Sequence, residues 1–162
     1  MLPAKLIMAP VDFSEHSEEA VKTAASLAGC FGSELFLVHV VPAIPTLPSV
    51  RTAFHEGEYE EELHTEAGKR LEQLAQSLGN VKTRTEVGTA NDVSMELLRI
   101  AEHNKVDLIV IATHGMTGWH KLAFGSVTEK VVRIAECPVL VLRAQVEAKP
   151  AAESQKQSAV AR

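Results

Sequence analysis

The sequence places small and hydroxyl-bearing residues at two points where a backbone could close around phosphates. Gly115 and Gly118 follow an apolar run over residues 106–111, and Gly125-Ser126 opens the next predicted helix. Glycine lets a backbone approach a ligand closely, and the first N–H groups of a helix attract anions. The spacing therefore predicts a nucleotide site in which both ends of one loop hold a phosphate chain.

These glycines follow neither of the common phosphate-binding signatures. The chain contains no G-x-x-x-x-G-K-S/T run and no G-x-G-x-x-G fingerprint, which argues against an ordinary P-loop NTPase and a standard dinucleotide site. A structural interpretation also stays open, because Ser126 and Glu129 have the spacing of a capping box and Asp12 could cap the first helix. His114 has no partnered carboxylate in the sequence, so we interpret it as a loop-shaping residue.

Short apolar strands alternate with amphipathic helices along the chain. Apolar runs predict strands over residues 6–9, 35–41, 106–111 and 138–142, of which 35–41 and 106–111 are central in the sheet, and alternation over 81–87 predicts a strand at or near a sheet edge. Helical spacing predicts helices between them, one capped by Ser14 and another by Asn91 or Asp92. We expect an α/β fold, a single doubly wound domain with a five-stranded, mostly parallel sheet and helices on both faces.

The expected sheet also says where a ligand would bind. In open sheets of this class, ligands lie beyond the carboxyl ends of the strands, at the point where the strand order reverses. Two loops compete for that position, residues 10–13 after the first strand and the glycine loop after the fourth. If these two strands are neighbours, Asp12 faces the glycine loop across one crevice.

Length and composition predict one compact domain. The chain has 162 residues, of which 46% are hydrophobic and 23% charged, enough for one core and too few for two ordinary domains. Residues 42–57 contain three prolines and no clear period, so we expect an irregular excursion there. Residues 144–162 show no apolar period and are predicted to form a disordered tail.

Charge and hydropathy argue against several partners. The net charge of −5 lacks the basic surplus that nucleic-acid binding normally needs, so we expect no nucleic-acid partner. No apolar stretch approaches the roughly 20 residues of a membrane span, and no signal peptide is evident, which predicts a cytoplasmic protein that is not in the membrane. Cys30 and Cys137 lie far apart, and the histidines show no metal-site spacing, so neither a disulfide nor a metal site is predicted.

Taken together, these motifs resemble those of the universal stress protein family. Its nucleotide-binding branch carries a glycine, two residues, a second glycine, nine residues, and then Gly-Ser or Gly-Thr. Here Gly115, residues 116–124 and Gly125-Ser126 match the second part, while the first glycine is Ala112. Residues 5–14, 38–40 and 137–142 also match, so we take residues 1–143 as the domain. The resemblance implies a Rossmann-like fold similar to that of the adenine nucleotide alpha hydrolases.

The resemblance also implies a function and a set of binding residues. It implies a small regulatory protein of the stress response that binds ATP or another adenine nucleotide, with Mg²⁺ or Mn²⁺. The implied binding residues lie in the first loop, in one strand, in the glycine loop and at the following helix start: Pro10, Val11, Asp12, Val40, Ile111, Ala112, Thr113, His114, Gly115, Met116, Thr117, Gly118, Gly125, Ser126, Val127 and Thr128. No catalytic residue is assigned.

Assembly and two alternative functions complete the expectations. The family implies a homodimer through the last strand, Val139 to Leu142, alongside unidentified protein partners. One alternative is an enzyme, a slow ATPase or a nucleotidyl transferase. The other is a dimeric interaction module with a weak or vestigial pocket, which Ala112 favours because a Cβ disfavours a left-handed backbone by about 1 kcal/mol.

Overall fold

The computed structural model describes residues 4–43, 56–113 and 125–143, with side chains described from residue 59 onward in the second range. Within these ranges strands alternate with helices, as the sequence predicts. The elements in chain order are β1 (Leu6–Pro10), α1 (Glu15–Phe31), β2 (Glu34–Pro42), α2 (Glu56–Ser77), β3 (Thr83–Ala90), α3 (Val93–His103), β4 (Leu108–Ala112), α4 (Ser126–Ile134) and β5 (Val139–Leu142).

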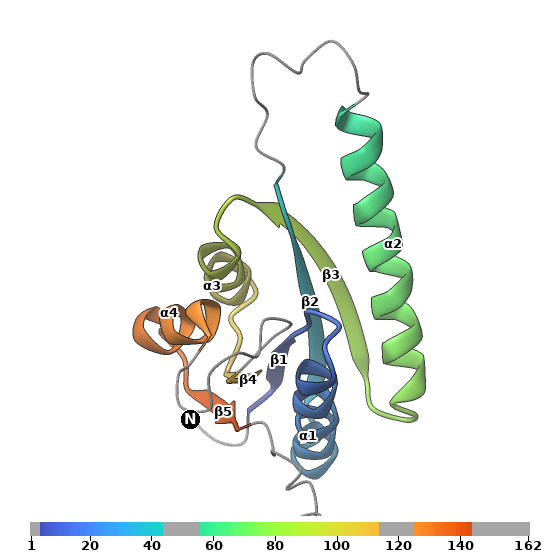
Figure 1. Ribbon diagram of the computed structural model, residues 1–162. Helices are drawn as coiled ribbons and strands as arrows, with labels where there is room; N and C mark the ends of the chain where they lie inside the picture. The colour runs from blue at the N-terminus through green and yellow to red at the C-terminus, as the bar shows by residue number, and fades with distance from the viewer. Residues whose placement is uncertain (1–3, 44–55, 114–124, 144–162) are drawn as a thin grey trace, which may run out of the picture.

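The strands form one parallel five-stranded sheet in the order β3-β2-β1-β4-β5, which confirms the predicted α/β fold class (Figure 1). The chain builds outward from β1 to β3, then returns to the other side of β1 to add β4 and β5. The strand order therefore reverses between β1 and β4, which pair directly through Ile7 with Leu108 and Met8 with Ile109. Ligands of this fold class bind at that reversal.

The helices lie in two layers, with α1 and α2 on one face of the sheet and α3 and α4 on the other (Figure 1). Successive side chains of a strand point to opposite faces, so each buried strand contributes side chains to the hydrophobic core on both faces of the sheet. Ile7, Leu35 and Leu37 pack beneath α1 and α2. Met8, Phe36 and Ile109 pack beneath α3 and α4. This explains why the central strands are continuous apolar runs rather than alternating ones.

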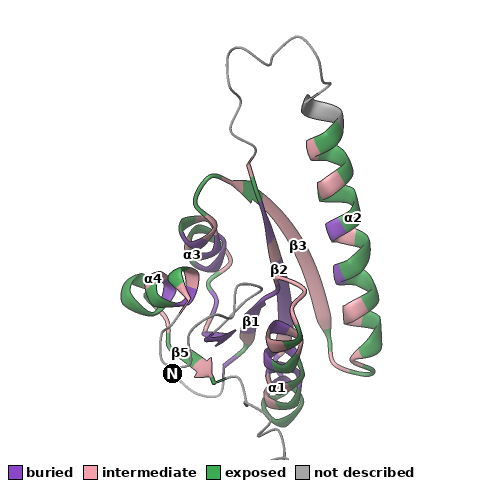
Figure 2. Cartoon of the chain, viewed as in Figure 1, coloured by how far each residue is buried: buried purple, intermediate pink, exposed green. Residues whose placement is uncertain are grey.

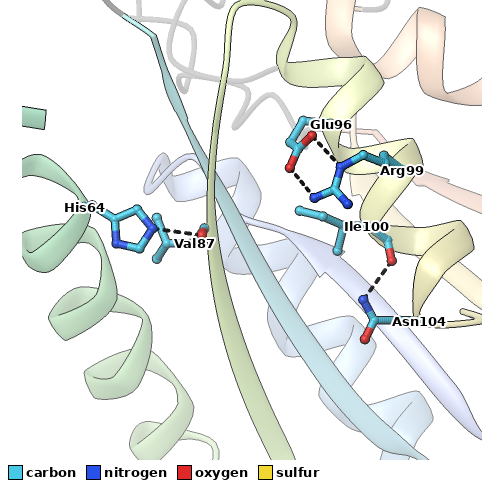
Figure 3. Close-up of polar contacts among 6 residues, drawn as sticks. All are labelled: His64, Val87, Glu96, Arg99, Ile100 and Asn104. Atoms are coloured by element: carbon cyan, nitrogen blue, oxygen red, sulfur yellow. Dashed lines mark hydrogen bonds and ion pairs between the residues drawn. The ribbon is translucent and has the colours of Figure 1, made fainter. Parts of the chain in front are cut away.

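Both edge strands are less buried than the central strands. All but one residue of β3 are only half-buried, whereas β1 and β4 are almost wholly buried (Figure 2). The parallel ladder turns the carbonyl of Val87 toward the open edge of β3, where His64 of α2 donates to it from Nε2 over 2.9 Å (Figure 3). On the other face of β3, Gly88 lets Glu96 and Ile100 of α3 approach the strand closely.

The two predicted N-caps are confirmed, and together they fix the starts of α1 and α3. Ser14 accepts a hydrogen bond from the Ser17 N–H, and Asp92 accepts one from the Met95 N–H. Cys30 and Cys137 are unpaired thiols. Among the described helices, none combines the length and the apolar character needed to cross a membrane. Of the predicted excursion over residues 42–57, residues 44–55 lie outside the described residues, while Pro42 ends β2 and α2 already begins at Glu56. The predicted tail, residues 144–162, also lies outside the described residues.

Candidate functional site

A cavity of about 280 Å³ lies at the reversal of the strand order. It is bounded by the carboxyl ends of β1, β2 and β4 and by the first turns of α3 and α4. Its lining residues are Pro10, Val11, Asp12, Ser17, Val38, His39, Val40, Val93, Leu97, Ile111, Ala112, Gly125, Ser126, Val127 and Thr128. The loop after β1 and the start of α4 therefore line one cavity, whereas the predicted position of the glycine loop across from Asp12 stays a prediction.

Most of the predicted binding residues that the structure describes line this cavity, and Thr113 lies next to it. The Thr113 N–H donates to the Leu142 carbonyl over 2.9 Å, and the Thr113 carbonyl accepts from the Gly125 N–H over 2.7 Å. The remaining predicted residues, His114, Gly115, Met116, Thr117 and Gly118, lie outside the described residues. Their place in the site stays a prediction.

At one end of the cavity, α4 begins without a side-chain cap. Its N-cap residue is Gly125, which has no side chain to bond to the first turn, unlike Ser14 and Asp92 at the starts of α1 and α3. The first intrahelical bond runs from the Glu129 N–H to the Gly125 carbonyl, so the three preceding N–H groups have no acceptor within the helix. These groups belong to Ser126, Val127 and Thr128, which line the cavity, so they can donate hydrogen bonds to an anion bound there.

The capping-box interpretation of Ser126 and Glu129 is wrong. Ser126 is the first residue of α4 and is exposed, while the extended backbone of Gly125, with φ −61° and ψ 150°, occupies the N-cap position. Glu129 instead accepts a hydrogen bond from Arg133 one turn later. Sequence spacing alone could not tell whether the helix starts after Gly125 or after Ser126, because glycine and serine are both acceptable N-caps.

Ala112 occupies the place of the family's first glycine without backbone strain. It is the last residue of β4 and pairs with Leu142 of β5. Among the described non-glycine residues, only Phe13 and Lys105 have positive φ. The cost anticipated for a left-handed alanine therefore does not arise, and the effect of Ala112 is limited to the space that one methyl group takes from the cavity.

Asp12 orders the loop after β1 and also lines the cavity. One oxygen of its carboxylate, Oδ1, accepts hydrogen bonds from the Ser14 N–H over 3.0 Å and from the Ser14 hydroxyl over 2.6 Å. Ser14 is the N-cap of α1, so Asp12 does not cap the helix itself but holds the capping residue in place. That structural role coexists with a position beside the cavity, because a carboxylate has several acceptor sites.

Sequence reasoning missed His39 as a lining residue. Its Nδ1 lies 2.7 Å from the carbonyl oxygen of Val11, and because a carbonyl only accepts, Nδ1 carries the proton. The ring of Phe13 lies against the imidazole, tilted by 39° with the centroids 4.6 Å apart, and the Arg70 guanidinium of α2 lies 3.9 Å from the centroid of the Phe13 ring. The available signal was a lone polar residue inside the apolar run of β2. Ser17, Val38, Val93 and Leu97 were also missed.

Burial makes the protonated form of His39 unfavourable. Desolvation lowers the pKa of His39 below its usual 6.5, with Arg70 contributing in the same direction, while the Val11 carbonyl and Asp12 oppose the shift. The unfolded chain then binds a proton more readily than the folded one, so the free energy of unfolding should fall as the pH drops below 6.5.

We expect His39→Asn to flatten this pH dependence. Denaturant unfolding followed between about pH 7.5 and 5.5 measures the slope for each protein. The wild type should lose more stability than His39→Asn over that interval, because asparagine does not titrate. Equal slopes for the two proteins would contradict the assignment of the effect to His39.

An exposed ion pair links the two helices whose starts line the cavity. Asp92 caps α3 and also pairs with Lys130 in the second turn of α4, which joins the two helices. The hydrogen bond from Lys130 is the largest of the effects that hold the pKa of the Asp92 carboxyl well below its usual range. Val93 and Leu97, in the first two turns of α3, line the cavity beside this pair.

The comparisons with known proteins agree with this architecture. Residues 3–143 match the sequence model of the universal stress protein family. Universal stress protein MJ0531 of Methanocaldococcus jannaschii is 37% identical over 141 residues, which cover 86% of this chain and 82% of that protein. The structure of universal stress protein UspA from Lactobacillus plantarum is 26% identical, with a TM-score of 0.74, and covers 86% of this chain and 97% of that one.

A more distant solved structure shares the fold with a ligand present. The universal stress protein from Archaeoglobus fulgidus in complex with dAMP is 20% identical, with a TM-score of 0.57 over 87% of this chain and 98% of that one. At this identity the likeness shows the fold alone. The family match over nearly all described residues, together with the close relative, shows that the chain belongs to the universal stress protein family.

Proposed function

We propose that this protein binds an adenine nucleotide, ATP in the first place, between the loops after β1 and β4, and acts as a regulatory protein of the stress response. One observation carries the proposal. A single cavity joins an apolar slot at the end of β2 to the uncapped start of α4. An apolar slot suits a nucleotide base, and the free N–H groups at the start of a helix suit a phosphate chain.

The base end of the cavity combines apolar walls with backbone polar groups. Val93, Leu97 and Ile111 provide flat apolar surface for a purine ring. β1 ends at Pro10, which pairs with Val38, whereas β2 continues to Pro42. The alternation of the ladder turns the N–H and C=O of Val40 toward the side where β1 has ended. The carbonyl can accept a hydrogen bond from the amino group of adenine, and the N–H can donate one to the neighbouring ring nitrogen.

The phosphate end uses the N-terminus of α4. Three backbone N–H groups of its first turn have no acceptor in the helix, and the helix dipole adds positive potential at this end. A divalent cation would bind with the phosphates, because Mg²⁺ usually keeps waters and takes one or two carboxylates plus phosphate oxygens. Within the described residues, no group of three or more potential ligands forms a metal site by itself. The carboxylate at this cavity is that of Asp12.

The bound nucleotide is tested first by analysis of the purified protein. The proposal predicts that denaturation of freshly purified protein releases an adenine nucleotide, which chromatography identifies, or that the empty protein takes up added ATP. Incubation of the ATP complex distinguishes a regulator from an enzyme. Release of ADP within seconds would contradict the regulatory proposal, because typical enzymes turn over at about 1–1,000 per second.

We also propose that two copies pair through β5. The ladder with β4 uses the Leu140 and Leu142 backbone, which turns the N–H and C=O of Val139 and Val141 toward the open edge. Leu140 is 37% exposed, which is high for a leucine in a sheet. An open edge with apolar side chains is a template for pairing with another strand.

Val141→Pro should convert this dimer into a monomer. Proline removes the N–H that faces the open edge, while the N–H groups that bond to β4 remain. Val141→Thr is the matched control, because it keeps that N–H and has a similar shape. Light scattering coupled to size-exclusion chromatography measures both masses. A dimeric Val141→Pro variant, or a monomeric wild type, would exclude pairing through β5.

A further inference from the structure

We infer that His39 is a positioning residue that opens the β1–β2 ladder, so that the backbone of Val40 is available to recognise the base. The inference rests on the proposed function and extends it to a residue outside the predicted set of binding residues. It starts from the hydrogen-bond pattern at the end of β1.

The ladder between β1 and β2 stops one bond earlier than its geometry allows. The Val11 N–H still donates to the Val38 carbonyl over 2.8 Å. In a regular parallel ladder the next bond would run from the Val40 N–H to the Val11 carbonyl. That carbonyl instead accepts the Nδ1 proton of His39 over 2.7 Å. The imidazole thus takes the acceptor that the Val40 N–H would otherwise use.

The surroundings of His39 hold its ring in the orientation that makes this bond. The ring of Phe13 packs against the imidazole with the centroids 4.6 Å apart, and the Phe13 backbone is in the left-handed region at φ 61°. A non-glycine residue rarely adopts that conformation, so packing must maintain it. The Arg70 guanidinium lies over the Phe13 ring, 3.9 Å from its centroid. The chain therefore turns away from β2 immediately after Val11.

This arrangement has a direct consequence for recognition of the base. With its acceptor taken by His39, the Val40 N–H lies at the cavity as a donor beside its own carbonyl. A ligand that presents an acceptor and a donor, as adenine does, matches this pair. Hypoxanthine presents a ring N–H and a carbonyl on the same edge, the reverse pattern, so ITP should bind more weakly than ATP.

A scalar coupling across the hydrogen bond tests the inference without any nucleotide. In the ligand-free wild type, NMR should show no coupling between the Val40 nitrogen and the Val11 carbonyl carbon. His39→Leu should produce that coupling, because the Val11 carbonyl becomes available to the Val40 N–H. His39→Asn retains an N–H donor near the Nδ1 position and should behave as the wild type. A Val40–Val11 coupling in the wild type overturns the inference even if His39→Leu does not fold.

Base discrimination tests the same inference through binding. His39→Leu should bring the ratio of the ITP and ATP dissociation constants at least severalfold closer to one, and His39→Asn should restore it. His64→Leu is the matched control, since His64 also donates to a carbonyl but lies outside the cavity, on α2 (Figure 3). A merely structural role for His39 would weaken both nucleotides equally and leave the ratio unchanged, which would overturn the inference.

The two proposals fail in different ways. If the wild type binds no ATP, the proposed function is wrong, while the coupling in ligand-free protein still tests the role of His39. If the wild type binds ATP but His39→Leu leaves the ratio of the ITP and ATP dissociation constants unchanged, the role of His39 is wrong and the proposed function is unaffected.

Discussion

Gly125→Val should weaken ATP binding by at least about tenfold, or about 1.4 kcal/mol, while leaving the protein folded. Gly125 is the N-cap residue of α4 and lines the cavity, so an isopropyl group there occupies the space beside the first-turn N–H groups. A Cβ at this position would also meet the Thr113 carbonyl at 3.3 Å, which displaces the start of α4 by a few tenths of an ångström. Isothermal calorimetry measures the affinity and circular dichroism the fold.

The backbone at Gly125 permits this experiment. Its φ of −61° suits any L-residue, so valine is not forced into a left-handed conformation. Gly68→Val is the matched control, because Gly68 lies within α2 and a Cβ there meets nothing within 4 Å. Normal ATP affinity in Gly125→Val would show that the start of α4 does not hold the phosphates.

Thr128→Val should lower the free energy of unfolding by about 1–3 kcal/mol, because it leaves a buried carbonyl without its donor. Thr128 is buried, with 4% of the residue exposed, and its hydroxyl donates to the Ala112 carbonyl over 2.7 Å. Valine has nearly the same shape and cannot replace that bond. Thermal unfolding should show a lower midpoint, by about 2–4 °C for each kcal/mol.

The same substitution separates two roles of Thr128. Its hydroxyl proton is committed to Ala112, so its contribution to a phosphate is through the backbone N–H. ATP affinity in Thr128→Val should therefore fall much less than in Gly125→Val. Thr128→Ser retains the hydroxyl and should keep most of the stability. Unchanged stability in Thr128→Val would mean that the bond to β4 contributes nothing measurable.

The fold was predictable from sequence because each of its strong signals is local. Continuous apolar runs identify β2 and β4 as strands buried on both faces, and alternation identifies β3 as an edge strand. Ser14 and Asp92 mark helix starts through short-range hydrogen bonds. The neighbouring positions of β1 and β4 depend on long-range pairing, which the sequence suggested only through the general rules for α/β sheets.

The site was less predictable because its decisive contacts are not local. His39 lies 28 residues from the carbonyl that it bonds, and inside an apolar run a single histidine gives no signal of that partner. Phe13 adopts a left-handed backbone that its residue type disfavours. The glycine motif left open whether Ala112 needs a left-handed backbone, and the structure answers this because Ala112 is the last residue of strand β4.

Calorimetric titration of the nucleotide-free protein with ATP, with and without Mg²⁺, tests the central claim most directly. The arrangement of the Val40 backbone, the apolar walls and the uncapped α4 predicts saturable binding of one ATP per chain, tightened by Mg²⁺. No saturable heat at millimolar ATP, in either condition, would contradict the nucleotide site and favour an interaction module that retains the fold without the ligand.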